Sequence, residues 1–133
     1  MTESLENYLE MISFLSDEPE NIPGGIRVTD IASRLNVSKP SVLTALKNLE
    51  EQGFIEHRHY STVTLTKKGK LEAMSIRERH LLLTSYLRDI LGVSAETAEK
   101  DACKMEHLLS DETLDRMKNQ VKMYPVIHAH QPC

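Results

Sequence analysis

The sequence predicts a mostly α-helical chain with one small β-hairpin near its middle. Apolar residues recur every three or four positions over most of the length, which is typical of amphipathic helices. Two short runs of residues that favour β-sheet, 54–58 and 63–66, flank a turn. Glycine and proline cluster at 17–25, where neither a helix nor a strand can continue.

Length and composition limit the classes of protein to which the chain can belong. Its 133 residues can form one compact unit or two small, closely packed ones. The longest apolar runs are far too short to span a bilayer, and we expect neither a secretory signal nor a membrane partner. Two cysteines make no disulfide framework, so we expect a cytoplasmic protein.

The charges are unevenly distributed along the chain. The net charge is −4, yet residues 26–70 contain eight basic and four acidic residues and are therefore positive by 4. The remainder carries the compensating negative charge. A basic module within an acidic protein is typical of a DNA-binding unit joined to a part that handles cations.

Residues 2–16 are expected to form an amphipathic helix. Its apolar side is a single stripe, made of Leu5, Tyr8, Leu9, Ile12 and Leu15. Glu6, Asn7 and Glu10 are expected at the edge of that stripe. The turn-rich segment 17–25 then serves as a linker.

Residues 27–49 have the pattern of two helices joined by a short turn. Thr29 is expected to cap the first helix. Ser38 is expected to cap the second, with Pro40 in its first turn, where the missing N–H group costs nothing. An ordinary helical hairpin has the same pattern. The basic β-hairpin that follows favours a winged helix-turn-helix DNA-binding domain over residues 1–70.

The second of these helices is expected to enter the major groove of double-stranded DNA. Hydroxyl groups and one proline are expected to contact base edges, from Ser38, Pro40, Ser41 and Thr44. Basic residues are expected to contact phosphates, namely Lys39, Lys47 and Arg58. Thr29 and Tyr60 complete the expected set of DNA-binding residues.

Residues 71–123 are expected to be entirely helical. A long helix that begins near residue 70 stops at Gly92, and Ser94 and Ser110 cap two shorter helices. These helices leave more apolar surface than one copy can cover, so we expect a homodimer. The tail, 124–133, is expected to be flexible, although it contains possible metal ligands in His128, His130 and Cys133.

The most distinctive motif is Cys103-x-x-Glu106-His107 in the first of the two shorter helices. Positions i, i+3 and i+4 share one face, so a thiolate, a carboxylate and an imidazole can converge on one metal ion. His80, in the middle of the long helix, is a further possible ligand. Taken alone, a Glu-His pair is common on a solvated surface and a lone cysteine is common as a small apolar filler.

These features, in this order, resemble the diphtheria toxin repressor and manganese transport regulator family of metal-dependent transcription repressors. The resemblance covers residues 5–121. It rests on Asn7-Tyr8-Leu9-Glu10, the two helices of 29–49, Thr64-Leu65-Thr66 before Lys68-Gly69, Arg79-His80, and Cys103-x-x-Glu106-His107-x-x-Ser110.

The resemblance implies a helical metal-binding and dimerisation domain over 71–123, in a short form of the family without the additional SH3-like domain. It places metal ligands at six positions, Asn7, Glu10, His80, Cys103, Glu106 and His107. Metal would then join the first helix to the dimerising half and set the separation of the two reading helices. The implied function is metal-dependent repression of metal uptake and homeostasis genes at (pseudo)palindromic operators.

The ligand positions mix two branches of the family. Asn7 stands where manganese-type members have Asp and iron-type members have Met, whereas Cys103 matches the iron type and Glu10 the manganese type. Thr84 and Glu99 replace the Glu and His of the iron type's ancillary site, so a second site of that kind is not implied. Cys103, the softest ligand, favours Fe(II), with Mn(II) as the alternative; Co(II), Ni(II) and Zn(II) are expected to bind in vitro.

Two other functions compete with this prediction. A small metalloenzyme that uses Cys103, Glu106 and His107 would lack a second acid–base constellation and would leave the basic module unexplained. A winged-helix regulator that senses an organic ligand or a redox state through Cys103 would retain that module. We expect a regulator and no enzymatic activity, and metal analysis of the purified dimer separates the two kinds of regulator.

Overall fold

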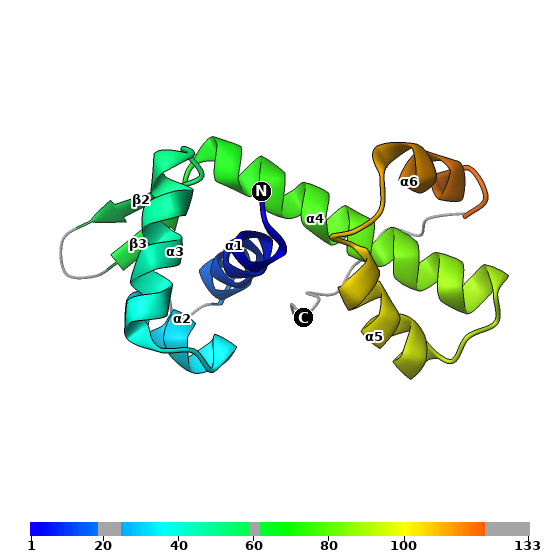
Figure 1. Cartoon of the computed structure of the whole chain (residues 1–133), viewed down its shortest axis with the longest axis horizontal. Coiled ribbons are helices and arrows are strands. Elements are labelled where there is room, and N and C mark those ends of the chain that lie inside the picture. Colours follow the sequence, from blue (N-terminus) through cyan, green and yellow to red (C-terminus); the bar gives the residue numbers. More distant parts are fainter. Residues whose placement is uncertain (19–24, 59–61, 122–133) are drawn as a thin grey trace. The chain divides into compact units, whose positions relative to one another are not determined.

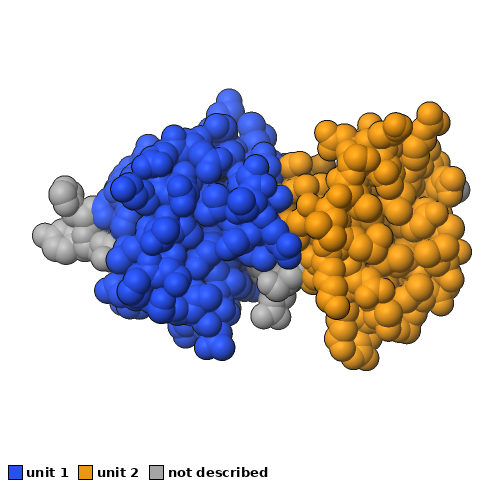
Figure 2. All heavy atoms as spheres, viewed as in Figure 1, with its two compact units in different colours: residues 1–74, 130–132 blue, residues 75–129, 133 orange. Residues whose placement is uncertain are grey.

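The computed structural model describes residues 1–18, 25–58 and 62–121, and these are mostly helical. Figure 1 shows the helices in chain order together with a small antiparallel sheet. The described residues fall into two compact units, Met1–Met74 and the residues from Ser75 onward (Figure 2). Helix α4 (Lys67–Ser85) contributes residues to both. None of the helices in the described ranges is both long and apolar enough to cross a membrane.

Three helices form most of the first unit: α1 (Glu3–Ser16), α2 (Val28–Leu35) and α3 (Lys39–Glu51). Ser38 caps α3 as expected, because its Oγ accepts a hydrogen bond of 3.3 Å from the amide of Ser41. Asn36 ends α2 in the left-handed conformation, at φ 54°, which asparagine tolerates better than most residues. The two helices with their short turn confirm the helix-turn-helix prediction.

The expected cap of α2 was wrong. Val28 opens the helix, Arg27 occupies the cap position without a side-chain hydrogen bond, and Thr29 is already the second helical residue. The reason is a strand that the sequence did not reveal. Ile26 and Arg27 form β1 and pair with β3, so the chain passes from the sheet directly into the helix.

The predicted hairpin is present as β2 (Ile55–Arg58) and β3 (Thr62–Leu65). The two strands pair in antiparallel register, and β3 lies between β1 and β2. Tyr60, one of the expected DNA-binding residues, lies outside the described residues.

The core of the first unit confirms the expected stripe of α1. Leu9, Ile12 and Leu15 are at most 1% exposed, and α1 contacts α2, α3 and β3. Two carboxylates predicted at the edge of the stripe are also buried, since Glu6 is 6% exposed and Glu10 is 5% exposed. Buried carboxylates are uncommon in proteins unless they have partners.

A compact corner joins the end of α3 to the start of α4. Thr66 Oγ1 donates a 2.6 Å hydrogen bond to the carbonyl of Gly53 and accepts one of 3.0 Å from the amide of Gly69. Lys68 Nζ donates to the carbonyl of Gln52 at 2.7 Å and lies 4.5 Å from the centre of the Phe54 ring. A Cβ atom on Gly69 would overlap the Phe54 carbonyl. These contacts fix the first turn of α4 within the first unit.

Helix α4 buries a different stripe from the one that its leucines and methionines suggest. Leu71 and Met74 are 58% and 57% exposed. The buried stripe instead comprises Ala73, Ile76, His80, Leu83 and Leu87, which recur at alternating spacings of three and four. A histidine therefore occupies a core position. After Ser85 the helix widens into a π-helical turn, η2 (Tyr86–Ile90).

The second unit is completed by α5 (Ala95–Met105) and α6 (Asp111–Lys118). Both predicted caps are confirmed, since Ser94 accepts from the amide of Thr97 and Ser110 from the amide of Thr113. The apolar core of this unit includes Leu82, Leu83, Ala102 and Leu114. Helix α5 ends at Met105, and Glu106 is its C-cap.

Candidate metal centre

His80 lies at the centre of a buried polar cluster in the second unit. Its side chain is completely inaccessible to solvent. Both ring nitrogens face carboxylates: Nδ1 lies 2.8 Å from Glu106 Oε2, and Nε2 lies 3.0 Å from Glu99 Oε1. A buried imidazole between two carboxylates is an arrangement that favours a cation at this point.

Helix α5 and its C-terminal end supply the other members of the cluster. Glu99 and Cys103 are one turn apart and therefore share a face of α5. Glu106 caps the helix and is 0% exposed, and the side chain of the next residue, His107, is 1% exposed. His107 Nε2 lies 3.2 Å from Glu106 Oε1, so Glu106 contacts both histidines.

Three of these residues satisfy the geometry of a shared metal site. The ligand atoms of His80, Glu99 and Cys103 all lie within 4.8 Å of one another. Cys103 Sγ is 4.0 Å from His80 Nδ1. Imidazole nitrogen, carboxylate oxygen and cysteine sulfur are together the donors of transition-metal sites. The residues present therefore fit a divalent cation.

The oxidation state of Cys103 determines whether its sulfur can be a ligand. Cys103 is not a free thiol in this structure. Only a thiolate is a strong metal ligand, so the sulfur must be reduced and deprotonated before it can bind.

The cluster also changes the proton affinity of His80. Burial alone lowers the pKa of an imidazole, but the hydrogen bond and charge of Glu106, together with the charge and hydrogen bond of Glu99, outweigh it. The pKa of His80 is consequently raised above its usual value. In the absence of metal, the proton on His80 partly neutralises two carboxylates.

Metal binding is expected to compete with this proton. The affinity for a divalent cation should rise as the pH increases through the raised pKa of His80, because a coordinating imidazole must be neutral. The stability of the metal-free protein should change in the opposite direction. Protonated His80 adds stability that is fully present below its unfolded pKa of about 6.5 and is lost as pH rises through the higher folded pKa. Calorimetry and urea unfolding across pH measure both effects, and a pH-independent metal affinity would contradict the first.

The structure brings together four of the six predicted ligands. His80, Cys103, Glu106 and His107 lie in one cluster of the second unit. Asn7 and Glu10 lie in the first unit, three positions apart on α1. Glu99 was not among the predicted ligands, because it was noted only as the residue that replaces the His of the iron type's ancillary site. Its position four residues before Cys103, on the same helical face, was the signal that could have identified it.

The expected DNA-binding residues of α3 are exposed and partly bonded to one another. Ser38 Oγ and Ser41 Oγ are 2.8 Å apart, and Thr44 Oγ1 donates to the carbonyl of Pro40 at 3.1 Å. Exposed residues of this set also include Thr29, Lys39, Lys47 and Arg58. Arg58 contacts Glu56 at 3.3 Å, a surface pair that a phosphate can displace at little cost.

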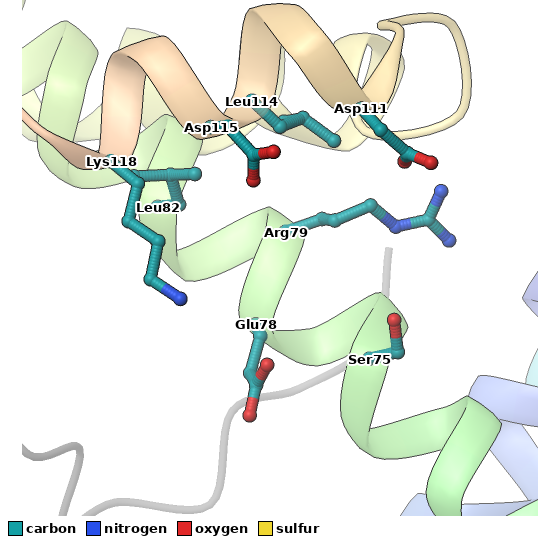
Figure 3. Close-up of a pocket in the computed structure, with 8 residues that line it drawn as sticks. All are labelled: Ser75, Glu78, Arg79, Leu82, Asp111, Leu114, Asp115 and Lys118. Atoms are coloured by element: carbon teal, nitrogen blue, oxygen red, sulfur yellow. The ribbon is translucent and has the colours of Figure 1, made fainter.

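A separate hollow of about 540 Å³ lies between α4 and α6 in the second unit (Figure 3). Leu82 and Leu114 form its apolar part. Its charged residues have both signs, with Arg79 and Lys118 opposed by Glu78, Asp111 and Asp115. Figure 3 shows Arg79 extending from α4 toward the side of Asp111. None of these residues belongs to the His80 cluster, so the hollow is distinct from the candidate centre.

Two family models match the two halves of the chain. Residues 1–63 match the N-terminal DNA-binding domain of the iron dependent repressor, and residues 66–130 match its metal binding and dimerisation domain. Both models describe a transcription repressor, which excludes the metalloenzyme alternative. A DNA-binding regulator acts where the chromosome is, so the expected cytoplasmic location is confirmed.

Individual relatives support the same assignment. The chain is 39% identical over 89% of its length to an uncharacterized HTH-type transcriptional regulator of Methanocaldococcus jannaschii, of which it covers 92%. It is 42% identical over 87% of its length to the transcriptional regulator MntR of Escherichia coli O6:H1, of which it covers 72%. A solved manganese-dependent transcriptional repressor in complex with manganese is 27% identical, with a TM-score of 0.74 over 87% of this chain and 51% of that one. The chain therefore belongs to the diphtheria toxin repressor and manganese transport regulator family of metal-dependent transcription repressors.

Proposed function

We propose that the protein is a homodimeric repressor that binds (pseudo)palindromic promoter DNA when Mn(II) or Fe(II) is bound, and that it controls genes of metal uptake and homeostasis. The observation that carries this proposal is the cluster in which Glu99, Cys103 and Glu106 surround the buried His80. The same chain also contains the reading helix α3, which exposes hydroxyl and basic side chains.

The proposed metal ligands come from three helices. His80 belongs to α4, while Glu99, Cys103, Glu106 and His107 belong to α5 and its end. Asn7 and Glu10 are included because of their place in the family's motif on α1. The metal would supply positive charge that neutralises converging carboxylates. A metal ion bound by α1 as well as by the dimerisation domain would limit the motion of the reading helices α3. Less conformational entropy would then be lost when the dimer binds DNA.

The choice between metals depends on the balance of hard and soft donors. Cys103 favours Fe(II) and later metals, which is the preference that the sequence alone suggests. Glu99 adds a carboxylate to the set, and carboxylates suit Mn(II). The names of the relatives point the same way, since one is called MntR and another structure contains manganese. We therefore place Mn(II) first and Fe(II) second, with Co(II), Ni(II) and Zn(II) as ions that bind in vitro.

The second unit exposes apolar side chains that suit contact with a second copy. Leu91 is 59% exposed, Leu108 is 75% exposed and Ile90 is 41% exposed. Together with the match to a dimerisation domain, these residues support a homodimer. A two-fold dimer presents two copies of α3, which is why we expect an operator with two related half-sites.

The proposal is tested by measuring DNA affinity with and without metal. Fluorescence anisotropy should show tight binding of the reduced protein to a promoter duplex in Mn(II) or Fe(II), and weak binding after chelation. Anaerobic calorimetry with each ion, followed by DNA binding with each, ranks the two metals. Equal DNA affinity with and without chelator would reject the metal switch. A purified dimer with no affinity for either ion would favour the alternative, a sensor of an organic ligand or redox state through Cys103.

A further inference from the structure

Helix α3 exposes a leucine on the side that carries its lysines. Leu43 is 40% exposed, whereas Val42 and Leu46 on the inner side of the helix are completely buried. The exposed Lys39 and Lys47 lie four positions before and four positions after Leu43. Residues four apart are neighbours on the surface of a helix. Leu43 is therefore an apolar side chain within a basic, exposed surface.

The hydroxyl groups of the same helix are largely occupied within it. Ser38 Oγ and Ser41 Oγ share a hydrogen bond of 2.8 Å. Thr44 Oγ1 donates its proton to the carbonyl of Pro40 at 3.1 Å. None of residues 38–47 is an arginine, asparagine or glutamine, the side chains that most often form paired hydrogen bonds with guanine or adenine. Apart from its lysines, this part of α3 therefore offers a base few free hydrogen-bond donors.

An apolar group flanked by positive charge matches one feature of DNA. The major groove displays a single kind of apolar group, the C5 methyl of thymine, and phosphates line both of its sides. Pro40 is exposed three positions before Leu43, so two apolar side chains are neighbours on this surface. Glu50, the acidic residue that follows on the same side, accepts a 3.0 Å hydrogen bond from the amide of His57 in β2. The surface around Leu43 thus combines apolar contact with attraction for phosphates.

We infer that Leu43 is a specificity-determining residue, which selects a thymine in each half-site of the operator by packing against its C5 methyl group. The inference rests on the proposed function, because it requires α3 to be the helix that enters the major groove. Contact with the leucine removes the methyl group from water, which favours binding. Cytosine has no methyl group at this position, so the contact discriminates between the two pyrimidines without a hydrogen bond.

The test removes the methyl group from the DNA and the leucine from the protein, separately and together. The reduced, metal-loaded dimer first selects its operator from a random pool of duplexes. Each thymine of that operator is then replaced by deoxyuridine, which lacks only the C5 methyl group. Anisotropy should show that the wild type loses about fourfold in affinity at one or more positions in each half-site, the effect of one buried methyl group. In Leu43→Ala, one of these losses should largely disappear, because the two changes remove the same contact.

Two further variants serve as controls. Leu71→Ala makes the same chemical change at another exposed leucine of the first unit, which is 58% exposed and lies on α4. It should respond to every deoxyuridine as the wild type does. Leu43→Met keeps an apolar side chain of similar volume and should retain the deoxyuridine effect that Leu43→Ala loses. Circular dichroism checks the fold of all three variants.

The outcomes separate this inference from the proposed function. A selected operator without a preferred thymine in its half-sites would overturn the inference, as would a wild type that is insensitive to deoxyuridine. A response of Leu43→Ala that equals the wild-type response at every position would overturn it as well. Metal-dependent DNA binding would stand in all three cases. A wild-type dimer that binds no DNA with metal would overturn both.

Discussion

Metal-dependent DNA binding is expected to be lost when Glu106 is replaced by glutamine. Glu106 is completely buried and contacts both His80 and His107. An amide keeps the shape of the side chain but removes the negative charge that a divalent cation needs. Loss of groups that merely support metal ligands costs 10- to 100-fold in affinity, so loss of a ligand is expected to cost about 100-fold or more. Calorimetry with Mn(II) and anisotropy with promoter DNA measure the two consequences.

A matched control is available on the same helix. Glu96 is a carboxylate of α5 whose side chain is 81% exposed, and its surface pair with Lys100 contributes little to stability. Glu96→Gln should retain the wild-type response to metal. Glutamine is preferable to alanine at 106 because truncation of a fully buried side chain leaves a cavity and obscures the result. If Glu106→Gln still responds normally to metal, the cluster is not the regulatory site.

The change Gly69→Ala is expected to destabilise the first unit by about 3 kcal/mol or more, at the upper end of the cost of overpacking. A methyl group at Gly69 would overlap the carbonyl of Phe54, which is backbone and cannot rotate away. Relief of the overlap would move α4 away from the corner. The hydrogen bonds of Thr66 and Lys68 would then be broken as well. Urea unfolding followed by circular dichroism measures the loss as a lower midpoint.

Gly53→Ala distinguishes steric overlap from backbone strain. Gly53 has φ +82°, but the nearest atom to an added Cβ is Lys68 Cδ at 3.9 Å. Gly53→Ala should therefore lower the free energy of unfolding by about 1–2 kcal/mol, the cost of a left-handed conformation for a residue other than glycine. If the urea midpoint of Gly69→Ala is equal to or higher than that of Gly53→Ala, the corner is not tightly packed.

The elements with strong local signals were predictable from the sequence. Serine caps before α3, α5 and α6 were confirmed because the cap interaction involves only neighbouring residues. Strand β1 was missed because two residues are too few to show a period, and its partner β3 lies far along the chain. The same pairing displaced the expected cap at Thr29. Leu71 and Met74 are exposed although they are apolar, because α4 buries the stripe that contains His80 instead.

The candidate site was predictable only where chemistry and helical spacing coincided. Cys103, Glu106 and His107 are close in sequence, so their shared face could be recognised directly. His80 joins them through tertiary packing of α4 on α5, which periodicity does not reveal and which the family resemblance supplied. Glu99 was missed because it differs from the residue that the iron branch has there. The preference among metals depends on the complete donor set, and one added carboxylate was enough to move our proposal toward Mn(II).

Helix α1 carries Asn7 and Glu10 and contacts the reading helix α3, so one rigid element links two proposed metal ligands to the DNA-reading surface. Coupling between two ligands of one protein is reciprocal: whatever factor metal contributes to operator affinity, the operator contributes to metal affinity. Promoters with stronger operators would then be half-occupied at lower concentrations of free metal than promoters with weaker ones. A single repressor would thereby switch off its target genes in sequence as the metal supply of the cell increases.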